Sequence, residues 1–240
     1  MDKNSITVGG KYKICSKLGK GAFGILYAGT DIKKSDIKVA IKMEKLTAFK
    51  PMLEYEAKLL EKLQGQSGFP KTLWNGIEGE FRILVMEMLG PNLHELFEFC
   101  DQKFKSTTIA WIAIQMLTRI EQMHALNIIH RDIKPENFLI GHHSKVNTLY
   151  CIDFGLSKRF VNPVSGSHVE FKKTSWVTGT PRYCSQNSFK GLNQSRRDDL
   201  ESIANILVYF TRNGWLPWMV AEKELEESKI QVHKKGEPCF

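Results

Sequence analysis

The spacing of apolar residues changes near residue 90, and this change limits the folds that the chain can adopt. Before Gly90, short β-branched and apolar runs predict strands over 12–19, 24–31, 38–45 and 81–89. Between the last two strands the pattern over 51–65 is helical. Pro51 is expected in the first turn of that helix and Gly65 just past its end.

After the Gly90–Pro91 pair, apolar residues recur every three or four positions, which predicts helices over 92–100, 107–127 and 197–214. The last helix is so apolar that we expect it to be interior, and 160–178 is expected to be a loop. The chain is thus predicted to be a single domain, 1–240, of the α+β class. A small β-rich lobe would span 11–88 and a larger, mainly helical lobe 89–240.

A glycine-rich turn joins the first two predicted strands. Gly19, Gly21 and Gly24 form a GxGxxG pattern in LGKGAFGILYAG. A dinucleotide-binding fold needs a helix after these glycines, and a strand pattern follows instead. The glycines fit an ordinary hairpin. They fit equally well a flap whose backbone N–H groups cover phosphates.

A lysine ends the third predicted strand. In isolation Lys42, the last residue of VAIK, would be a solvated strand end. After a glycine-rich hairpin it can instead point at nucleotide phosphates, and it then needs an acidic partner. Glu56 in the following helix is the expected partner, ahead of Glu54.

The stretch IIHRDIKPENFLIG, residues 128–141, places charged residues between two apolar segments. Asp132 suits a general base or a buried structural acid, and Lys134 suits a phosphate contact or a solvated charge. Asn137 suits a metal ligand or a turn. In YCIDFGLS, Asp153 follows an apolar strand and is either part of an ordinary turn or a carboxylate aimed at Mg²⁺. The order of these residues along the chain favours a catalytic role over the structural alternatives.

These four stretches, in this order, resemble the signature set of protein kinases over residues 11–218. The resemblance implies a two-lobed kinase fold and ATP-dependent transfer of a phosphoryl group to a protein hydroxyl. ATP and Mg²⁺ would be the cofactors. The lysine two positions after Asp132 resembles Ser/Thr kinases rather than tyrosine kinases.

The resemblance also implies roles for individual residues. Asp132 would orient the substrate hydroxyl and accept its proton, while Lys134 would stabilise the γ-phosphate. Asn137 and Asp153 would hold Mg²⁺. Asp199 would anchor the catalytic loop from below. The residues around ATP would be Leu18, Gly19, Gly21, Gly24, Leu26, Ala40, Lys42, Glu56, Met86, Glu87, Leu89 and Leu139.

A narrower resemblance is to the casein kinase I family, carried by LGPNLHELF, IDFGLSKRF and TGTPRYCSQNSFKGLNQSRRDDLESIANILVYFTRNGWLPW. That family favours Ser or Thr preceded by acidic or phosphorylated residues. The resemblance implies an anion contact for Arg182, with Lys172 and Lys173 as further candidates. The family has a second basic contribution after the LPW motif, where this chain is mostly acidic beyond Trp218.

The same resemblance implies that the helical lobe lacks its last helices, because the family's catalytic domain continues further. We expect the helix over 200–210 to lose part of its cover as a result. The alternatives to an active enzyme are a non-catalytic, pseudokinase-like scaffold and an inactive truncated fragment.

The formal net charge of +8 suits nucleic acid, an anionic membrane or acidic substrates. We find no basic stripe interleaved with aromatic residues, so no specific nucleic-acid partner is expected. No apolar run approaches the roughly 18 residues of a membrane span. Five scattered cysteines without a CxxC pair predict reduced thiols in the cytoplasm and/or nucleus. We expect a monomer that binds ATP and acidic or phosphorylated proteins.

Overall fold

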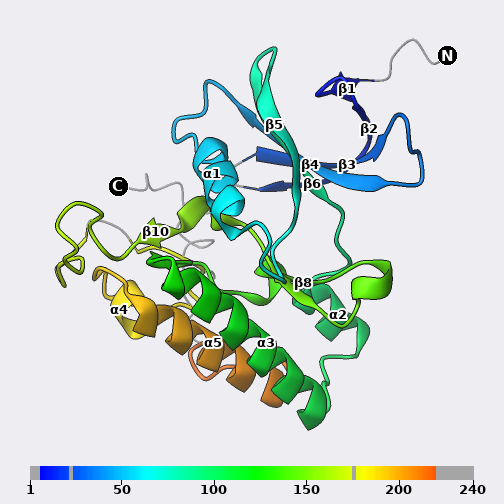
Figure 1. The fold of residues 1–240 in the computed structure, drawn as a ribbon. Helices are drawn as coiled ribbons and strands as arrows, with labels where there is room; N and C mark the ends of the chain where they lie inside the picture. The colour runs from blue at the N-terminus through cyan, green and yellow to red at the C-terminus, as the bar shows by residue number, and fades with distance from the viewer. Residues whose placement is uncertain (1–5, 22–23, 175–176, 220–240) are drawn as a thin grey trace, which may run out of the picture.

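The computed structural model describes residues 6–21, 24–174 and 177–219, which form a sheet with one helix and, next to it, a mainly helical part (Figure 1). The sheet is antiparallel and has six strands in the order β1-β2-β3-β4-β6-β5. The strands are β1 (Thr7–Val8), β2 (Tyr12–Gly21), β3 (Gly24–Asp31), β4 (Lys38–Lys45), β5 (Thr72–Glu78) and β6 (Phe81–Glu87).

Sequence analysis did not predict the two edge strands, β1 and β5. Strand β1 pairs with β2 through a turn in which Gly9 and Gly10 both have φ of 60°. Val8 is only 2% exposed, so the β-rich part begins before the residue 11 that we expected. Strand β5 pairs with β6 across a short turn in which Gly79 has φ of 54°. Left-handed backbone at these turns favours glycine.

Helix α1 (Leu53–Leu63) begins two residues later than the predicted 51–65, so Pro51 lies before its first turn rather than in it. The Glu44 carboxylate of β4 explains this start, because it accepts the N–H groups of Met52 at 2.8 Å and Leu53 at 3.3 Å. Gly65 follows the helix end with φ of 85°, as predicted.

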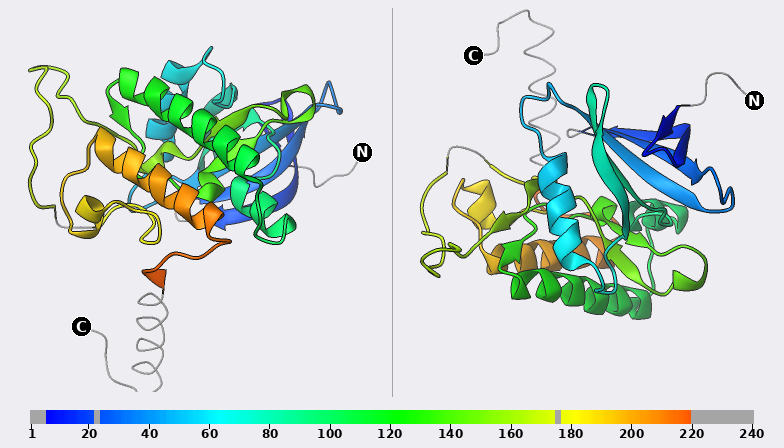
Figure 2. Two further views of the ribbon diagram at one scale, coloured as in Figure 1. Left: turned by 90° about the horizontal axis from the view of Figure 1, so that it is seen from below. Right: turned by 45° about the horizontal axis from the view of Figure 1, so that its top comes forward.

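The second part contains the helices α2 (Leu93–Phe99), α3 (Ser106–Ala125), α4 (Gln186–Phe189) and α5 (Arg196–Thr211). Helices α3 and α5 lie side by side (Figures 1 and 2). A capping box begins α2, in which the side chains of Asn92 and Glu95 each accept the other's backbone N–H at 2.9 Å. The helical predictions for this part are confirmed to within a few residues at each end.

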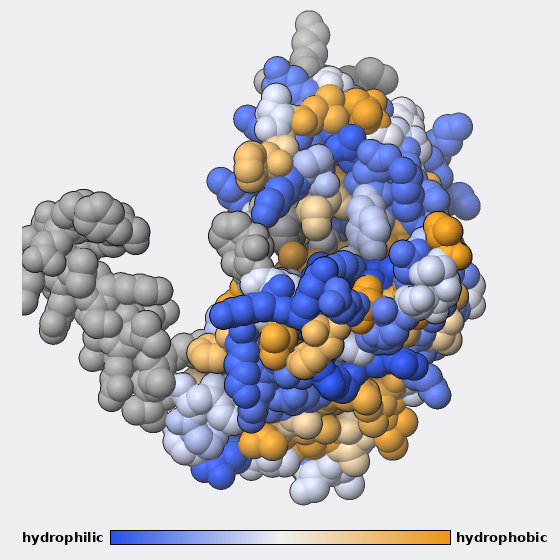
Figure 3. All heavy atoms as spheres, turned by 90° about the vertical axis from the view of Figure 1, so that its left-hand side faces the viewer, coloured by the Kyte–Doolittle hydropathy of each residue, from blue (hydrophilic) through white to orange (hydrophobic). Residues whose placement is uncertain are grey.

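Helix α5 is buried on one face only, which corrects the expectation that it is interior. Ile203, Ile206 and Phe210 are at most 2% exposed, whereas Leu200 is 45% and Val208 41% exposed within the described residues. Side chains on one face of a helix recur every three or four residues, so a helix with apolar residues all round exposes some of them unless it is surrounded. Figure 3 shows hydrophobic side chains on the lower, helical part of the face it presents.

Two small two-stranded ribbons pack against the helices of the second part. Strands β7 (Ile128–Ile129) and β10 (Lys158–Arg159) pair, as do β8 (Phe138–Ile140) and β9 (Leu149–Cys151). Short 3₁₀ turns, η1 (Pro135–Asn137), η2 (His143–Lys145) and η3 (Phe154–Leu156), lie between these strands. The described residues of 160–178 contain no helix or named strand, as predicted.

One apolar core runs through both parts of the molecule. It includes Leu60 of α1, Met86 of β6, Phe154 of η3 and Ile206 of α5, all at most 9% exposed. A smaller cluster lies on the other face of the sheet. No helix within the described ranges has the length and apolar character needed to cross a bilayer.

Candidate active site

The glycine-rich hairpin is the turn between β2 and β3. Gly19 lies opposite Leu26 and Gly21 opposite Gly24, while residues 22–23 lie outside the described chain. Gly24 has φ of 139°, and a Cβ atom there would collide with the carbonyl oxygen of Met43. Glycine is therefore required at position 24. Leu18, before the turn, is 51% exposed.

Alternation along β4 separates core residues from candidate site residues. Val39 and Ile41 are fully buried in the smaller cluster, so Ala40 and Lys42 point to the opposite face, toward the helical part. Ala40 pairs with Met86, which belongs to the large core. Two other residues expected around the adenine of ATP are Leu89, which follows β6, and Leu139, which lies on β8. Leu139 forms an isolated antiparallel β-bridge with Asn92.

Lys42 contacts two carboxylates from different parts of the fold. Its Nζ lies 2.6 Å from Glu56 Oε2 and 3.0 Å from Asp153 Oδ1. Glu54, the second choice of partner, instead contacts Lys58 and Arg82. Burial by itself lowers the pKa of Lys42, but the charges of Glu56 and Asp153 outweigh burial and hold its pKa above the ordinary value. Burial raises the pKa of Glu56, and the charge of Lys42 opposes that rise.

The β8–β9 ribbon brings Asn137 and Asp153 to the same end of the site. Phe138 pairs with Cys151, and the N–H of Ile152 donates to the carbonyl of Asn137 at 3.0 Å. Asp153 follows directly and has left-handed backbone, with φ of 61°. Burial raises the pKa of the Asp153 carboxyl, but Lys42, His130 and Lys134 outweigh this, so its pKa lies below the ordinary value.

Asp132 is the centre of a buried polar cluster. One carboxylate oxygen lies 2.8 Å from Lys134 Nζ and the other accepts from the Thr180 hydroxyl at 2.7 Å. The Asn137 amide donates to the Asp132 carbonyl at 2.8 Å and to its carboxylate at 3.3 Å. The structure therefore brings together the three residues expected to be catalytic. Thr180 was missed, because a threonine 48 positions away carries no local signal.

Asp199 holds the loop that carries Asp132. Its carboxylate is 1% exposed and accepts the N–H groups of His130 and Arg131, both at 2.9 Å. The His124 Nε2 atom lies 2.9 Å from the same carboxylate. Asp199 stands in the first turn of α5, so its helix N-terminus also favours the negative charge. His124 was not predicted, since its sequence context is that of an ordinary amphipathic helix.

The neighbouring Asp198 holds a different segment. It accepts hydrogen bonds from the Ser185 hydroxyl at 2.7 Å and the Asn187 amide at 3.0 Å. It also accepts the N–H of Ser195 at 2.7 Å. The SQN triplet of 185–187 is thus fixed to the start of α5.

The side chain of Glu87 links the end of β6 to the helical part. Glu87 Oε2 lies 2.7 Å from Lys145 Nζ in η2, and Oε1 accepts the N–H of Lys71 at 3.0 Å. The N–H of Glu87 already donates to the Lys71 carbonyl at 3.0 Å. A backbone hydrogen bond to the adenine base of ATP would therefore come more readily from Leu89 than from the N–H of Glu87.

The three candidate anion-contacting residues lie in different surroundings. Arg182 is partly buried, and its carbonyl accepts the indole N–H of Trp218 at 2.8 Å. Lys172 is exposed and forms a 3.2 Å ion pair with Glu170. Lys173 is also exposed and forms a backbone bridge with Leu192.

Asn137 and Asp153 offer an amide and a carboxylate oxygen, which are hard donors of the kind that Mg²⁺ prefers. Magnesium usually takes only one or two protein ligands and completes its shell with phosphates and water. Within the described residues no group of three or more His, Cys, Asp or Glu side chains could form a dedicated metal cage. The donor set fits an ion that arrives with a nucleotide.

The comparison with known families agrees with this geometry. A family model described as "Protein kinase domain" matches residues 12–236. The match covers the β-rich part, the polar cluster and the helical part together.

Proposed function

The chain belongs to the protein kinase domain family, and from that premise we propose that it transfers the γ-phosphoryl group of ATP to Ser or Thr side chains of proteins. The observation that carries this proposal is the polar cluster around Asp132, which joins Lys134, Asn137 and Thr180 within 2.7–2.8 Å. Phosphoryl transfer requires positioning and charge neutralisation more than covalent chemistry from the protein.

Each side chain has a defined task in this mechanism. Lys42, held by Glu56 and Asp153, binds the α- and β-phosphates. Asp132 orients the acceptor hydroxyl and takes its proton, while Lys134 neutralises charge on the transferred group. Bound Mg²⁺ supplies further neutralisation of the phosphates through Asn137 and Asp153.

Two observations support Ser/Thr acceptors and the casein kinase I type. Lys134 and Thr180 both contact Asp132, on opposite carboxylate oxygens, and Lys134 is the residue whose position resembles Ser/Thr kinases. The SQN triplet is fixed by Asp198, a residue of the SRRDDLES segment that carries the narrower resemblance. With Arg182 as an anion contact, we propose acidic or phosphorylated protein substrates.

The experiment compares acidic peptides that differ only in the acceptor, Ser, Thr or Tyr, with labelled ATP and Mg²⁺. We expect transfer to Ser and Thr, and a loss of about a hundredfold or more in Asp132→Asn and Asp153→Ala. Asp36→Asn, which changes an exposed aspartate in the β3–β4 loop, should match wild type.

Three results would count against this proposal. Transfer to Tyr alone would overturn the acceptor class. Equal rates on neutral and acidic peptides, unchanged in Arg182→Gln, would overturn the substrate class. Nucleotide binding with no transfer to any peptide would indicate a non-catalytic scaffold.

A further inference from the structure

An amide side chain interrupts the apolar run IANILVYF of helix α5, residues 203–210. Asn has a lower helix propensity than Ala or Leu, because its side chain competes with the backbone for hydrogen bonds. Asn205 uses this capacity outside its own helix. Its Nδ2 atom donates to the carbonyls of Tyr183 at 3.2 Å and Cys184 at 3.4 Å. The amide therefore attaches the segment before α4 to the middle of α5.

Residues 180–184 form a tight turn with Arg182 at its centre. The Thr180 carbonyl accepts two N–H groups from the end of the turn, both at 3.0 Å. The Thr180 hydroxyl donates to Asp132 at 2.7 Å, which fixes the start of the turn to the proposed catalytic residue. Asn205 holds the two carbonyls at the other end. The turn is thus attached on both sides of Arg182.

The end of the turn has a second contact with α5. Tyr183 is 2% exposed, and its ring packs edge-on against Tyr209 with ring centroids 5.6 Å apart. Tyr209 is four residues after Asn205, so the two side chains lie on the same face of the helix. The ring contact fixes how deeply Tyr183 is buried. Hydrogen bonds are directional, so those from Asn205 fix the orientation of two successive peptide planes.

The backbone orientation of this turn determines where Arg182 points. Arg182 is partly buried, and its own carbonyl accepts the indole N–H of Trp218 at 2.8 Å. A guanidinium recognises a carboxylate or phosphate through paired N–H donors in a planar fork. Such recognition depends on orientation more than the attraction of a point charge does. A rotated turn would still carry the charge of Arg182 but would present the fork in the wrong direction.

We propose that Asn205 is a positioning residue for substrate recognition, which orients Arg182 so that its guanidinium meets an acidic or phosphorylated side chain of the substrate. This inference rests on the proposed function, because it concerns the substrate class of that reaction. Asn205 acts through the turn and takes no part in phosphoryl transfer. Its loss should therefore change the affinity for the peptide rather than the rate of the chemical step.

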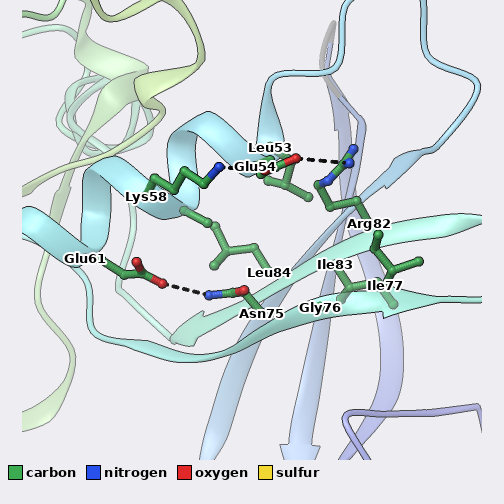
Figure 4. A pocket seen from close by; sticks show the side chains of 11 residues that line it. Leu53, Glu54, Lys58, Glu61, Asn75, Gly76, Ile77, Arg82, Ile83 and Leu84 are labelled. Atoms are coloured by element: carbon green, nitrogen blue, oxygen red, sulfur yellow. Dashed lines mark hydrogen bonds and ion pairs between the residues drawn. The ribbon is translucent and has the colours of Figure 1, made fainter.

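The test uses Asn205→Leu, which keeps a branched side chain and removes the two N–H donors. Two peptides share an acceptor serine and carry either phosphoserine or alanine at one position before it. We expect the KM for the phosphorylated peptide to rise about tenfold, while kcat and the KM values for the alanine peptide and ATP stay within about twofold of wild type. Asn75→Leu is the matched control, because it removes an amide that donates to Glu61 at 3.0 Å beside α1 (Figure 4).

A double variant separates positioning from a general loosening of α5. Arg182→Gln alone should raise the KM for the phosphorylated peptide about tenfold. Adding Asn205→Leu to it should change this KM by about twofold or less, because the group that Asn205 orients is already absent. The inference would be overturned by a full tenfold loss in both backgrounds. A KM that rises equally for both peptides, or for ATP, would overturn it as well.

Fluorescence anisotropy with the phosphorylated peptide measures binding without phosphoryl transfer. If wild type transferred no phosphoryl group, the proposed function would fail, yet Asn205→Leu should still raise the Kd of this peptide about tenfold. If wild type bound the phosphorylated peptide no more tightly than the alanine peptide, Arg182 would not be an anion contact and the inference would fail. Equal binding by Asn205→Leu and wild type would also exclude the positioning role.

Discussion

The ion pair between Lys42 and Glu56 differs from a surface pair in how much each side chain is buried. The side chains are 15% and 3% exposed, whereas Lys58 and Glu54 form a pair of the same 2.6 Å length with 67% and 55% exposure. We expect Lys42→Met to lower the free energy of unfolding by about 3 kcal/mol, because it leaves Glu56 buried without a cation. Lys58→Met should cost about 0.5 kcal/mol or less.

Urea unfolding of both variants measures this difference. The double variant Lys42→Met/Glu56→Leu should recover much of the loss, since an apolar pair needs no compensation. If Lys42→Met were as stable as wild type, the buried pair would not contribute to folding.

Asp153 gives a prediction for the pH dependence of stability. Its folded-state pKa lies below the ordinary value of 3.8, so the ionised carboxylate stabilises the fold. That contribution is complete above the unfolded-state pKa and is lost as the pH falls through the lower folded-state pKa. The stability difference between wild type and Asp153→Asn should therefore be constant from pH 7 to roughly pH 5 and shrink in more acidic solution. Urea unfolding across this range measures it, and a difference that grows on acidification would contradict the assignment.

At the level of elements, the start of α5 serves two segments through adjacent residues. Asp199 holds His130 and Arg131, which precede Asp132, while Asp198 holds Ser185 and Asn187. We expect Asp199→Asn to lower kcat by about tenfold or more for both ATP hydrolysis and peptide phosphorylation, because it loosens the loop that carries Asp132.

Asp198→Asn is the matched variant, since both carboxylates are 1% exposed. It should impair peptide phosphorylation while leaving ATP hydrolysis without peptide near wild type. Steady-state kinetics with and without peptide separates the two effects. Equal losses in both reactions for both variants would mean that α5 acts as one structural unit.

The sequence predicted elements whose signal is local and missed those defined by distant contacts. Asp132, Asn137 and Asp153 could be found because their spacing along the chain is itself the motif. Strand β5, TLWNGIE, contains Asn75 and Gly76, which favour turns, and only its pairing with β6 makes it a strand. Glu44 capping α1 was equally invisible, because a buried glutamate on a strand indicates no particular partner.

The whole molecule should unfold as one unit, because a single apolar core includes residues of α1, β6 and α5. The proposed nucleotide site also draws on both parts, with Lys42 from the sheet and Asp153 from the segment just after β9. We expect one cooperative thermal transition whose midpoint temperature rises when ATP–Mg²⁺ is added. At a nucleotide concentration of about a hundred times the Kd, the free energy of unfolding increases by about 2.7 kcal/mol.

Thermal unfolding of wild type and Asp153→Ala, with and without nucleotide, tests this prediction. In Asp153→Ala the part of the rise in midpoint temperature that depends on Mg²⁺ should be largely absent, because one of the two proposed oxygen ligands of the ion is missing. Two separate transitions in wild type would contradict the shared core.

Helix α1 is anchored at both ends. At its start Glu44 of β4 accepts the N–H groups of Met52 and Leu53. At its end Leu63 is fully buried in the core shared with the helical part, and the Gln64 amide donates to the Pro70 carbonyl at 3.1 Å. The helix is therefore a strut between the sheet and the helical part, and a displacement of one part relative to the other would be transmitted to Glu56, which lies between the two anchors.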